Sequence, residues 1–468
     1  MYGETIYALA TAAGRAGVAV VRISGEAAGP ALMRLTGRPL PPPRRAVLRR
    51  FLDTDGERDR QRDGVGDGDG AEALDRGLVL WFPGPGSFTG EDVVELHLHG
   101  GRAVVGGVLR ALGRLPGLRP AEPGEFSRRA FANGRFDLTA AEGLADLVAA
   151  ETAAQRRQAL AQMGGALGRL YDGWRQRLLR ALAHLEAAID FADEELPPEL
   201  VADVGSQVTR LLAEMRRHLD DAGRGERIRG GIEIAVIGPP NAGKSTLVNA
   251  LARREVAIVS PHPGTTRDVI EVPLDMAGYA VVLSDTAGLR ETAGEAEVQA
   301  SARAIEGEGI RRARARASAA DVVIAVFDGA AWPAIDGETA AIAVATSAMV
   351  LINKGDLGRV DGAAMIGGNP AIVVSAMTGE GMESLQAMLV ATIESRFAAG
   401  EGPVLSRLRH RQALAAAVAA LEAFSPAKPI EEAAEELRSA IDALGRITGR
   451  VDVEEMLDVI FRDFCIGK

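Results

Sequence analysis

The chain has 468 residues, of which 53 are lysine or arginine and 64 are aspartate or glutamate, so its formal net charge is −11. At roughly 150 residues per domain, this length predicts about three domains. The 47% hydrophobic and 25% charged content is that of a folded globular protein and excludes a disordered chain. The acidic balance argues against a protein that coats nucleic acid nonspecifically.

No run of eighteen apolar residues occurs, and the start, MYGETIYALATAAGRAG, lacks a basic segment followed by an apolar one. The sequence therefore predicts neither a membrane span nor a secretory signal, and we expect a cytoplasmic protein. The single cysteine, Cys465, excludes an internal disulfide and a multi-cysteine zinc site, which suits a reducing compartment.

The first 120 residues are expected to form a mixed α/β unit. Short β-like runs over residues 18–23, 77–82 and 93–97 are separated by glycine and proline turns. Residues 53–70 contain six aspartates and five glycines, and have too little apolar surface to offset their ordering entropy. We therefore predict a disordered loop there.

Helical spacing dominates residues 121–222 and returns in residues 397–468. Between them, a glycine-rich stretch at 222–231 leads into alternating strand and helix signals over 223–396, which are typical of a doubly wound parallel sheet. Neither helical segment alone has a full set of facing apolar surfaces. We therefore predict that the two segments pack together and that the α/β domain is inserted between them.

The strongest chemical signal is GPPNAGKS at residues 238–245, which follows the apolar run 232–237 and precedes a helical run at 246–252. This is a G-x-x-x-x-G-K-S phosphate loop in its strand-loop-helix setting. Its glycines let successive N–H groups face the phosphates, Lys244 neutralises the β and γ oxygens, and Ser245 ligates magnesium. The predicted contacts are Asn241, Ala242, Gly243, Lys244, Ser245 and Thr246.

Two further motifs follow predicted strands. LSDTAG at 283–288 places a carboxylate in the magnesium shell and a glycine N–H near the γ-phosphate. NKGD at 353–356 follows the apolar strand 349–352, and Asp356 accepts from guanine N1–H and the exocyclic amine, a donor pair that adenine lacks. Such sheets bind ligands at the carboxyl ends of their strands, so a GTPase domain is predicted. The predicted contacts are Asp285, Thr286, Ala287, Gly288, Asn353, Lys354, Asp356, Ser375, Ala376 and Met377.

These motifs do not reveal the catalytic device. Ras-type enzymes orient the attacking water with a glutamine directly after DxxG, but this chain has Leu289 there. Asn241 is either a turn residue or a ligand of a monovalent cation beside the phosphates, and the loop alone supports both readings equally. The segment VSPHPGTTRD at 259–268 either completes such a cation site with carbonyls and hydroxyls or is a proline-rich surface turn.

Motifs along nearly the whole chain resemble those of the MnmE/TrmE tRNA-modification GTPases. The resemblance implies an α/β multidomain protein with an N-terminal tetrahydrofolate-binding and dimerisation domain (1–120), a helical domain (121–222 and 397–468) and an inserted P-loop, Ras-like GTPase domain (223–396). Besides the GTPase motifs, the resemblance depends on GRAGVAVVRISG at 14–25, SFTGEDVVELHLHG at 87–100, PGEFSRRAFANGRFDL at 123–138 and FCIGK at 464–468.

The resemblance also implies that potassium-dependent dimerisation activates the GTPase. The family's water-orienting glutamate maps onto Glu306, with Glu308 and Glu297 as alternatives, and each of the three is otherwise read as a solvated surface residue. Magnesium would be held by Ser245 and Thr266. The potassium ligands would be Asn241, Ser260, Thr265 and the backbone of His262, within a nucleotide-binding loop of Ser260, Pro261, His262, Pro263, Gly264, Thr265 and Thr266.

By the same resemblance, the homodimer works with an FAD-containing partner, MnmG/GidA, in a heterotetramer or larger complex away from membranes. The pair would add an aminomethyl or carboxymethylaminomethyl group to C5 of the wobble uridine of certain tRNAs. The one-carbon unit would come from 5-formyl- or 5,10-methylene-tetrahydrofolate. The folate-site residues implied by position are Arg22, Glu95, Arg135 and Lys468, although Arg22 and Glu95 read more simply as strand-end surface charges.

Three assignments stay open from the sequence. Cys465 is either an idle thiol or a participant in the modification chemistry, since two cations nearby in sequence favour its thiolate. His97 and His99 share one face of a strand and are expected to be structural, because no third metal ligand lies nearby. The arginine-rich run 311–316 is either a tRNA contact or a solvated helix face.

Two other functions share the nucleotide motifs, namely a GTP-switched ribosome assembly factor and a membrane-associated GTP switch. An assembly factor would carry a basic RNA-binding module, where this chain has the folate-like motifs and FCIGK. A membrane switch is disfavoured because the sequence has no apolar span.

Overall fold

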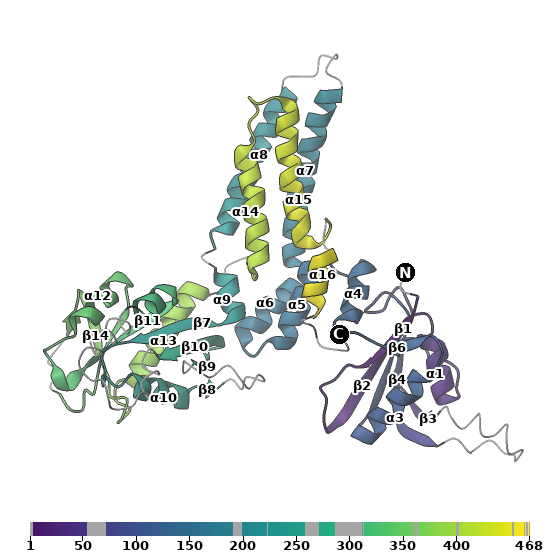
Figure 1. The fold of residues 1–468 in the computed structure, drawn as a ribbon, viewed down its shortest axis with the longest axis horizontal. Helices are drawn as coiled ribbons and strands as arrows, with labels where there is room; N and C mark the ends of the chain where they lie inside the picture. The colour runs from purple at the N-terminus through teal and green to yellow at the C-terminus, as the bar shows by residue number, and fades with distance from the viewer. Residues whose placement is uncertain are drawn as a thin grey trace, which may run out of the picture. The chain divides into compact units, whose positions relative to one another are not determined.

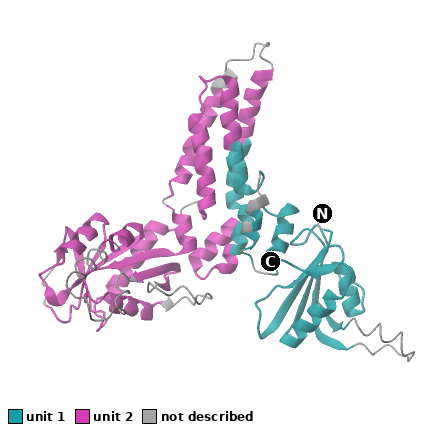
Figure 2. Ribbon diagram, viewed as in Figure 1, with its two compact units in different colours: residues 1–145, 163–176, 441–468 teal, residues 146–162, 177–440 magenta. Residues whose placement is uncertain are grey.

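The computed structural model describes residues 3–53, 72–190, 199–221, 223–257, 271–285, 311, 313–358, 360, 364–398, 402–451, 454–462, 464 and 467. The loop predicted to be disordered, from residue 54 onward, lies outside them. Two compact units divide the chain (Figure 2): residues 1–145, 163–176 and 441–468 form the first, and residues 146–162 and 177–440 form the second. None of the described helices is long and apolar enough to cross a bilayer.

The first unit is built on a six-stranded sheet of order β3-β4-β5-β2-β1-β6 (Figure 1). Neighbouring strands pair antiparallel, apart from the parallel pair β1 and β6. The predicted strands are confirmed within β2, β4 and β5, and with them the mixed α/β character. The strands are β1 (Thr5–Leu9), β2 (Ala16–Ser24), β3 (Val47–Leu52), β4 (Ala73–Phe82), β5 (Val93–Gly100) and β6 (Leu118–Pro120).

Helices α1 (Ala28–Thr36) and α3 (Arg102–Gly113) cover one face of this sheet. Strand residues facing the helices, including Val21, Ile23 and Phe51, are 0% exposed. Because successive side chains of a strand point to opposite faces, the residues between them emerge on the face that these two helices leave open. Polar residues of β2 and β5 therefore gather on that open face.

The carboxyl-terminal segment packs onto the first unit. Helix α16 (Glu454–Arg462) contacts α4 (Glu125–Ala132). A β-carbon on Gly124 would lie 2.3 Å from the carbonyl oxygen of Phe461, and one on Gly467 would lie 2.4 Å from a β1 carbonyl oxygen. Both positions therefore require glycine, and the end of the chain is held beside β1.

The second unit contains an eight-stranded sheet of order β13-β14-β12-β11-β7-β10-β9-β8. Strands β7, β10, β11, β12 and β14 are parallel, as predicted, whereas β8, β9 and β13 pair antiparallel at the two edges, which the sequence analysis did not predict. The strands are β7 (Ile232–Ile237), β8 (Val256–Ala257), β9 (Glu271–Met276), β10 (Tyr279–Asp285), β11 (Val322–Asp328), β12 (Met349–Asn353), β13 (Met365–Ile366) and β14 (Asn369–Val373).

Helices cover both faces of the parallel strands, which confirms the doubly wound arrangement. Helices α9 (Arg224–Gly230), α10 (Lys244–Arg254) and α13 (Met382–Phe397) pack on one face, and α12 (Gly337–Ala345) packs on the other. Helix α9 lies within the glycine-rich stretch at 222–231, where the sequence analysis predicted no element. Its arginines and Glu226 favour a helix, which ends where Gly231 adopts a φ of 101°.

Long helices from both flanks of the sheet region lie side by side (Figure 1), as expected for an inserted domain. In the second unit, Arg216 of α8 pairs with Glu422 of α14 at 2.5 Å, and Arg438 of α15 pairs with Glu186 of α7 at 3.1 Å. The helices of this region are α5 (Leu138–Ala149), α6 (Ala153–Met163), α7 (Ala166–Asp190), α8 (Glu199–Leu219), α14 (Leu408–Ala423) and α15 (Ile430–Thr448).

Candidate functional site

The phosphate loop leaves the carboxyl end of β7 and enters α10. Gly238 and Gly243 have φ angles of 153° and 87°, in the region that favours glycine. A β-carbon on Gly238 would lie 2.3 Å from the carbonyl oxygen of Val326, and one on Gly243 would lie 2.3 Å from Nδ2 of Asn353. Backbone conformation and packing therefore both require glycine at these two positions.

Lys244 holds positive charge inside this loop. Its side chain lies in the first turn of α10, and the residue is only 6% exposed. The ammonium donates to the carbonyl oxygens of Gly238 and Pro239, both at 2.9 Å. Because the N–H groups at the start of α10 point toward the same place and carry partial positive charge, the loop forms an anion-binding site suited to phosphate. Ser245 and Thr246 are exposed on the same turn.

Asn353 joins three predicted nucleotide-binding segments. It is 2% exposed at the end of β12. Its Nδ2 donates to the Ala242 carbonyl oxygen at 2.9 Å, and its Oδ1 accepts from the Ala376 N–H at 3.0 Å. This contact forms because β7, β12 and β14 are parallel, so their carboxyl ends share one edge of the sheet.

The side chains available to a base lie at the same edge. Asp356 and Met377 are exposed, and Ser375, which follows β14, is buried. Lys354 has a φ of 62° and donates to Asp328 at 2.7 Å. Burial raises the pKa of the Asp328 carboxyl, but hydrogen bonds from the Lys354 ammonium and the Ala330 N–H outweigh burial and lower this pKa below its ordinary value.

The metal and γ-phosphate side of the site is only partly described. Strand β10 runs beside β7, with Asp285 opposite Val236, so the DTAG motif begins next to the phosphate loop. Asn241 has a φ of 65° and an exposed side chain. This backbone suits a turn asparagine and leaves the amide free to serve as a cation ligand. The predicted residues outside the described part of the chain are Ser260, Pro261, His262, Pro263, Gly264, Thr265, Thr266, Thr286, Ala287, Gly288 and Glu306.

A second group of predicted site residues meets on the open face of the first unit. Arg22 of β2 and Glu95 of β5 are register neighbours, and the Arg22 guanidinium donates to Glu95 Oε1 at 2.8 and 3.1 Å. The guanidinium lies 5.3 Å from the ring centroid of Phe88 and 5.8 Å from that of Phe126. It also donates to the Gly467 carbonyl oxygen at 3.4 Å, which brings the FCIGK segment to the same place.

The remaining members of this predicted group are less closely placed. Arg135 is exposed, and its Cδ lies 3.3 Å from the position of a β-carbon on Gly90, in the connection between β4 and β5. Cys465 and Lys468 lie outside the described residues, although the described Gly467 lies between them in sequence.

Two family models match the chain. "GTP-binding protein TrmE N-terminus" matches residues 5–135, and "MnmE helical domain" matches residues 138–465. The tRNA modification GTPase MnmE of Paramagnetospirillum magneticum is 58% identical over 465 residues, which cover 99% of this chain and 100% of that protein. The chain belongs to the MnmE family of tRNA modification GTPases. The resemblance noted from the motifs is therefore confirmed.

Other members of the family agree with this assignment. The tRNA modification GTPase MnmE of Parvibaculum lavamentivorans is 55% identical, over 99% of this chain and all of that protein. A human mitochondrial protein named as a 5-taurinomethyluridine tRNA synthase subunit is 47% identical, over 100% of this chain and 94% of its own length. Like its relatives, this MnmE-family chain is a GTP hydrolase that acts in tRNA modification.

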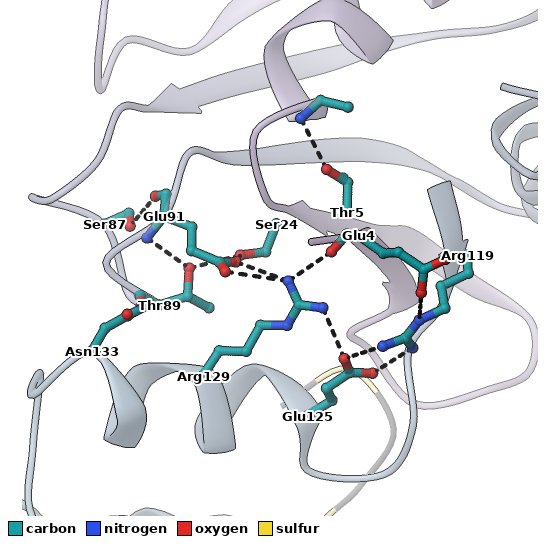
Figure 3. Close-up of polar contacts among 11 residues, drawn as sticks. Glu4, Thr5, Ser24, Ser87, Thr89, Glu91, Arg119, Glu125, Arg129 and Asn133 are labelled. Carbon is teal, nitrogen blue, oxygen red and sulfur yellow. Dashed lines mark hydrogen bonds and ion pairs between the residues drawn. The ribbon is translucent and has the colours of Figure 1, made fainter. Parts of the chain in front are cut away.

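A buried ionic network, which the sequence analysis missed, supports the open face (Figure 3). The side chain of Arg129, on α4, is 0% exposed. It donates to both carboxylate oxygens of Glu91 at 3.2 Å, to Glu125 Oε1 at 2.9 Å and to the Glu4 carbonyl oxygen at 2.9 Å. A buried cation needs such partners, since an unpaired charge is costly away from water.

The network continues through hydroxyl groups to β2. Ser24 donates to Glu91 Oε2 at 2.7 Å and shares a 2.7 Å hydrogen bond with the Thr89 hydroxyl. Asn133 Nδ2 donates to the Thr89 carbonyl oxygen at 2.7 Å. These bonds fix the connection between β4 and β5 (Figure 3). The same connection carries Phe88, whose ring lies beside the Arg22 guanidinium.

The residues of this network lie in two motifs of the sequence. Glu91 and Thr89 fall in the SFTGED motif, and Arg129 falls in the PGEFSRRAF motif, both of which carried the family resemblance. By sequence alone these motifs indicate the family. In the structure, Arg129 of one motif binds Glu91 of the other. Only the fold could reveal that pairing, because Arg129 and Glu91 are 38 positions apart.

The two histidines make contacts typical of structural residues. His99 Nδ1 lies 2.8 Å from Asp75 Oδ1, and the His99 backbone N–H donates to the other carboxylate oxygen. His97 Nε2 lies 3.6 Å from Glu95 Oε2. Among the described residues no group of three or more potential metal ligands is found.

Proposed function

We propose that the chain is a potassium-activated, cytoplasmic GTPase that works with an FAD-containing partner of the MnmG/GidA type. Together they would add an aminomethyl or carboxymethylaminomethyl group to C5 of the wobble uridine of certain tRNAs, with a one-carbon unit from 5-formyl- or 5,10-methylene-tetrahydrofolate. The observation that carries the GTPase part is the Asn353 amide, whose two hydrogen bonds join the phosphate loop, the NKGD motif and the Ser375–Ala376 segment at one sheet edge.

Selection of guanine is assigned to Asp356. Its exposed position beside the Asn353 anchor leaves the carboxylate available to accept from guanine N1–H and the exocyclic amine. An adenine in this position would offer no matching donor pair, so the carboxylate would be desolvated without compensation. GTP would then be favoured over ATP.

Catalysis is assigned to positive charge held by the loops. Lys244 supplies one charge from within the phosphate loop, and Asn241, with its exposed amide, would contribute to a potassium site completed by Ser260, Thr265 and the His262 backbone. Bound potassium would supply the charge that an arginine finger supplies in other GTPases.

Magnesium would be held by Ser245, which the structure exposes in the first turn of α10, together with Thr266. Glu306 is proposed to orient the attacking water, because the position after DTAG is Leu289 and carries no polar group for that role.

The Arg22 and Glu95 pair is proposed to bind the folate. The guanidinium suits the carboxylates of the glutamate tail, and Glu95 Oε2 accepts from amino groups of the pterin. The Phe88 and Phe126 rings beside the guanidinium offer apolar surface to the pterin ring. Bound tetrahydrofolate would supply the one-carbon unit, with Arg135 and Lys468 as further contacts and Cys465 as a participant in the chemistry.

The open sheet face is proposed to form the homodimer. On β2 it carries the exposed apolar side chain of Val18 (55%), near the polar Arg22 and Glu95 pair. A second copy of this face would bury this side chain and enclose the folate site between the two copies. The FAD-containing partner would then join this dimer in a heterotetramer or larger complex.

The cation dependence of GTP turnover tests the catalytic proposal. We expect hydrolysis to be several-fold to orders of magnitude faster in potassium chloride than in sodium chloride of equal ionic strength, because sodium is too small for the ligand cage. Asn241→Ala should abolish the difference while GTP still binds, since Lys244 and Asp356 remain. Equal wild-type rates in the two salts would contradict the potassium site.

Nucleoside analysis tests the modification proposal. The chain would be incubated with the FAD-containing partner, GTP, the folate and an unmodified tRNA transcript, and the digested tRNA analysed by mass spectrometry. We expect the modified wobble uridine only in the complete mixture. Full product without the folate would exclude folate as the one-carbon source.

A further inference from the structure

One segment of the first unit departs from the acidic character of the chain. Residues 27–52 contain six arginines and no lysine, aspartate or glutamate, although the net charge of the chain is −11. We call the six arginines, together with Arg76, the arginine edge. Its members are Arg34, Arg38, Arg44, Arg45, Arg49, Arg50 and Arg76.

The fold gathers these arginines along one border of the sheet. Arg34 lies in the last turn of α1, which contacts β3, and Arg38, Arg44 and Arg45 lie in the connection from α1 to β3. Strand β3 carries Arg49 and Arg50 and is the terminal strand of the six-stranded sheet. Arg50 is the register partner of Arg76 on β4, so the positive charge continues onto the next strand.

Most of these guanidinium groups are available to an outside ligand. Six of the seven are exposed, Arg49 being the half-buried exception. In the part of the chain that the structure describes, no carboxylate forms an ion pair with any of the seven. Arg44 donates a hydrogen bond to the Gly86 carbonyl oxygen at 2.8 Å. By contrast, Arg314, an exposed arginine of the second unit, pairs with Glu338 at 2.7 Å.

Two carboxylates close to the arginine edge in sequence are already engaged. Asp53, which follows β3, pairs with Arg114 at 2.9 Å. Asp75, next to Arg76 on β4, binds the His99 ring at 2.8 Å and the His99 N–H at 2.8 Å. Burial raises the pKa of the Asp75 carboxyl, but its hydrogen bonds to His99 outweigh burial and hold this pKa below the ordinary value.

We propose that the arginine edge binds the sugar-phosphate backbone of the tRNA substrate. A chain of net charge −11 repels a polyanion, so an RNA-binding surface on it must be a local region rich in cations. The edge is made only of arginine, whose planar fork donates two parallel hydrogen bonds to a phosphate. This inference rests on the tRNA modification activity of the family and not on the folate or potassium assignments.

The surface is suited to positioning the tRNA rather than to reading its sequence. The aromatic side chains of β3 and β4 nearest the edge are buried, with Phe51 0% and Trp81 7% exposed, so they cannot stack on bases. Phosphate contacts hold a nucleic acid in register without selecting bases. We infer that the edge orients the tRNA body, while recognition of the wobble uridine occurs elsewhere.

The test measures tRNA binding directly by the full-length chain. The edge variant replaces Arg38, Arg45, Arg50 and Arg76 with glutamine. The control variant makes the same charge change at four exposed arginines of α6 and α8, namely Arg156, Arg157, Arg210 and Arg217. Binding of an unmodified tRNA transcript is measured by fluorescence anisotropy over a series of salt concentrations, and thermal unfolding verifies that both variants are folded.

We expect the edge variant to bind the transcript about 10- to 100-fold more weakly at low salt and the control variant to lose at most a few-fold. The slope of log affinity against log salt should become shallower by about 3 to 4 in the edge variant, since each lost phosphate contact removes nearly one unit. GTP hydrolysis without tRNA should be unchanged, because the edge lies in the first unit and the phosphate loop in the second.

Two results would overturn the proposal: unchanged tRNA affinity of the edge variant, or equal losses in the two variants. If unchanged tRNA affinity were accompanied by lost association with the FAD-containing partner, the edge would bind an acidic protein surface instead. If the fourfold edge variant unfolds early, the pair Arg45→Gln and Arg76→Gln gives the same comparison against Arg156→Gln and Arg157→Gln.

Discussion

At the scale of single residues, Asn353 shows how one amide organises the nucleotide site. Both ends of the side chain are hydrogen-bonded, one to the phosphate loop and the other to the segment after β14. Replacing it would leave the buried Ala242 carbonyl oxygen unpaired, at about 1–3 kcal/mol, and would remove the partner of the half-buried Ala376 N–H. The Asp356 side chain is exposed and does not hold the loops together as Asn353 does, so its substitution reports on base recognition alone.

We predict that Asp356→Asn relaxes guanine selectivity. The amide cannot accept from both guanine donors, so GTP affinity should fall by about 10- to 100-fold, the equivalent of about 1.4–2.8 kcal/mol. Xanthosine triphosphate, which carries a carbonyl in place of the exocyclic amine, should gain affinity. Competition binding with the two nucleotides measures the change, and Glu380→Gln, an exposed substitution at the same sheet edge, serves as the control. Unchanged discrimination would contradict the assignment of Asp356.

A second residue-scale prediction concerns Glu125 and pH. Burial raises the pKa of this carboxyl, but hydrogen bonds from Arg119, the Glu122 N–H and Arg129 outweigh burial, so the pKa is lower in the folded chain than the ordinary 4.5. The ionised group therefore stabilises the folded state above pH 4.5, and this contribution is lost as pH falls through the lowered pKa.

Urea unfolding between pH 7 and pH 3.5 measures this effect. The free energy of unfolding of the wild-type chain should fall on acidification, and Glu125→Gln should show a shallower fall. Glu122→Gln, an exposed change three residues earlier, should follow the wild-type curve because the Glu122 backbone N–H is retained. Parallel curves for wild type and Glu125→Gln would refute the role given to this carboxylate.

At the scale of elements, helix α4 holds the connection between β4 and β5 in place through an ion pair. The Arg129 guanidinium joins that connection, through Glu91, to the helix and to the residue preceding β1. This ion pair matters to the folate proposal because the same connection carries Phe88, which lies against Arg22. A rigid connection keeps the open face prepared for a ligand before the ligand arrives.

We predict that Arg129→Met destabilises the first unit by about 3–5 kcal/mol, since it leaves the Glu91 carboxylate with no cation partner in a half-buried site. The neighbouring Arg128 provides a matched control on the same helix. Its 3.0 Å pair with Asp458 is largely exposed, so Arg128→Met should cost no more than about 1 kcal/mol. Urea unfolding followed by tryptophan fluorescence measures both variants, and similar losses would show that Arg129 is not a special anchor.

At the scale of the whole molecule, the two candidate sites belong to different compact units. The phosphate loop and base-binding residues lie in the second unit, and the Arg22 and Glu95 pair lies in the first with the end of the chain. A substitution in one site should therefore leave the local chemistry of the other intact. This separation makes the two activities distinguishable by mutation.

We predict that Cys465→Ser leaves GTP hydrolysis unchanged and lowers tRNA modification at least tenfold. Gly467 of the same FCIGK segment contacts Arg22 in the first unit, whereas the phosphate loop belongs to the second unit, so we expect the thiol to take no part in GTP hydrolysis. Parallel assays of phosphate release and of modified nucleosides measure the two outcomes. If the Cys465→Ser variant modified the wobble uridine normally, the thiol would have no role in the modification chemistry and the prediction would be wrong.

The contiguous motifs made much of the nucleotide site predictable. The phosphate loop, NKGD and the strands before them follow from residues that are neighbours in sequence, and these strands appear as β7 and β12. The antiparallel edges β8, β9 and β13 and the short helix α9 were not predicted, because short elements take their conformation from neighbouring strands and helices more than from their own residues.

The amino-acid sequence by itself determined the chemistry of the GTP site, since a phosphate loop needs only local backbone geometry and a few side chains at fixed spacing. Only the tertiary structure decided which distant charges meet. Arg22 reaches the carbonyl of Gly467 across 445 positions, and Asn353 reaches Ala242 across 111. Such pairs are set by strand order and by packing of the chain end onto β1, and these arise from the burial of apolar surface in the whole unit and not from any local pattern.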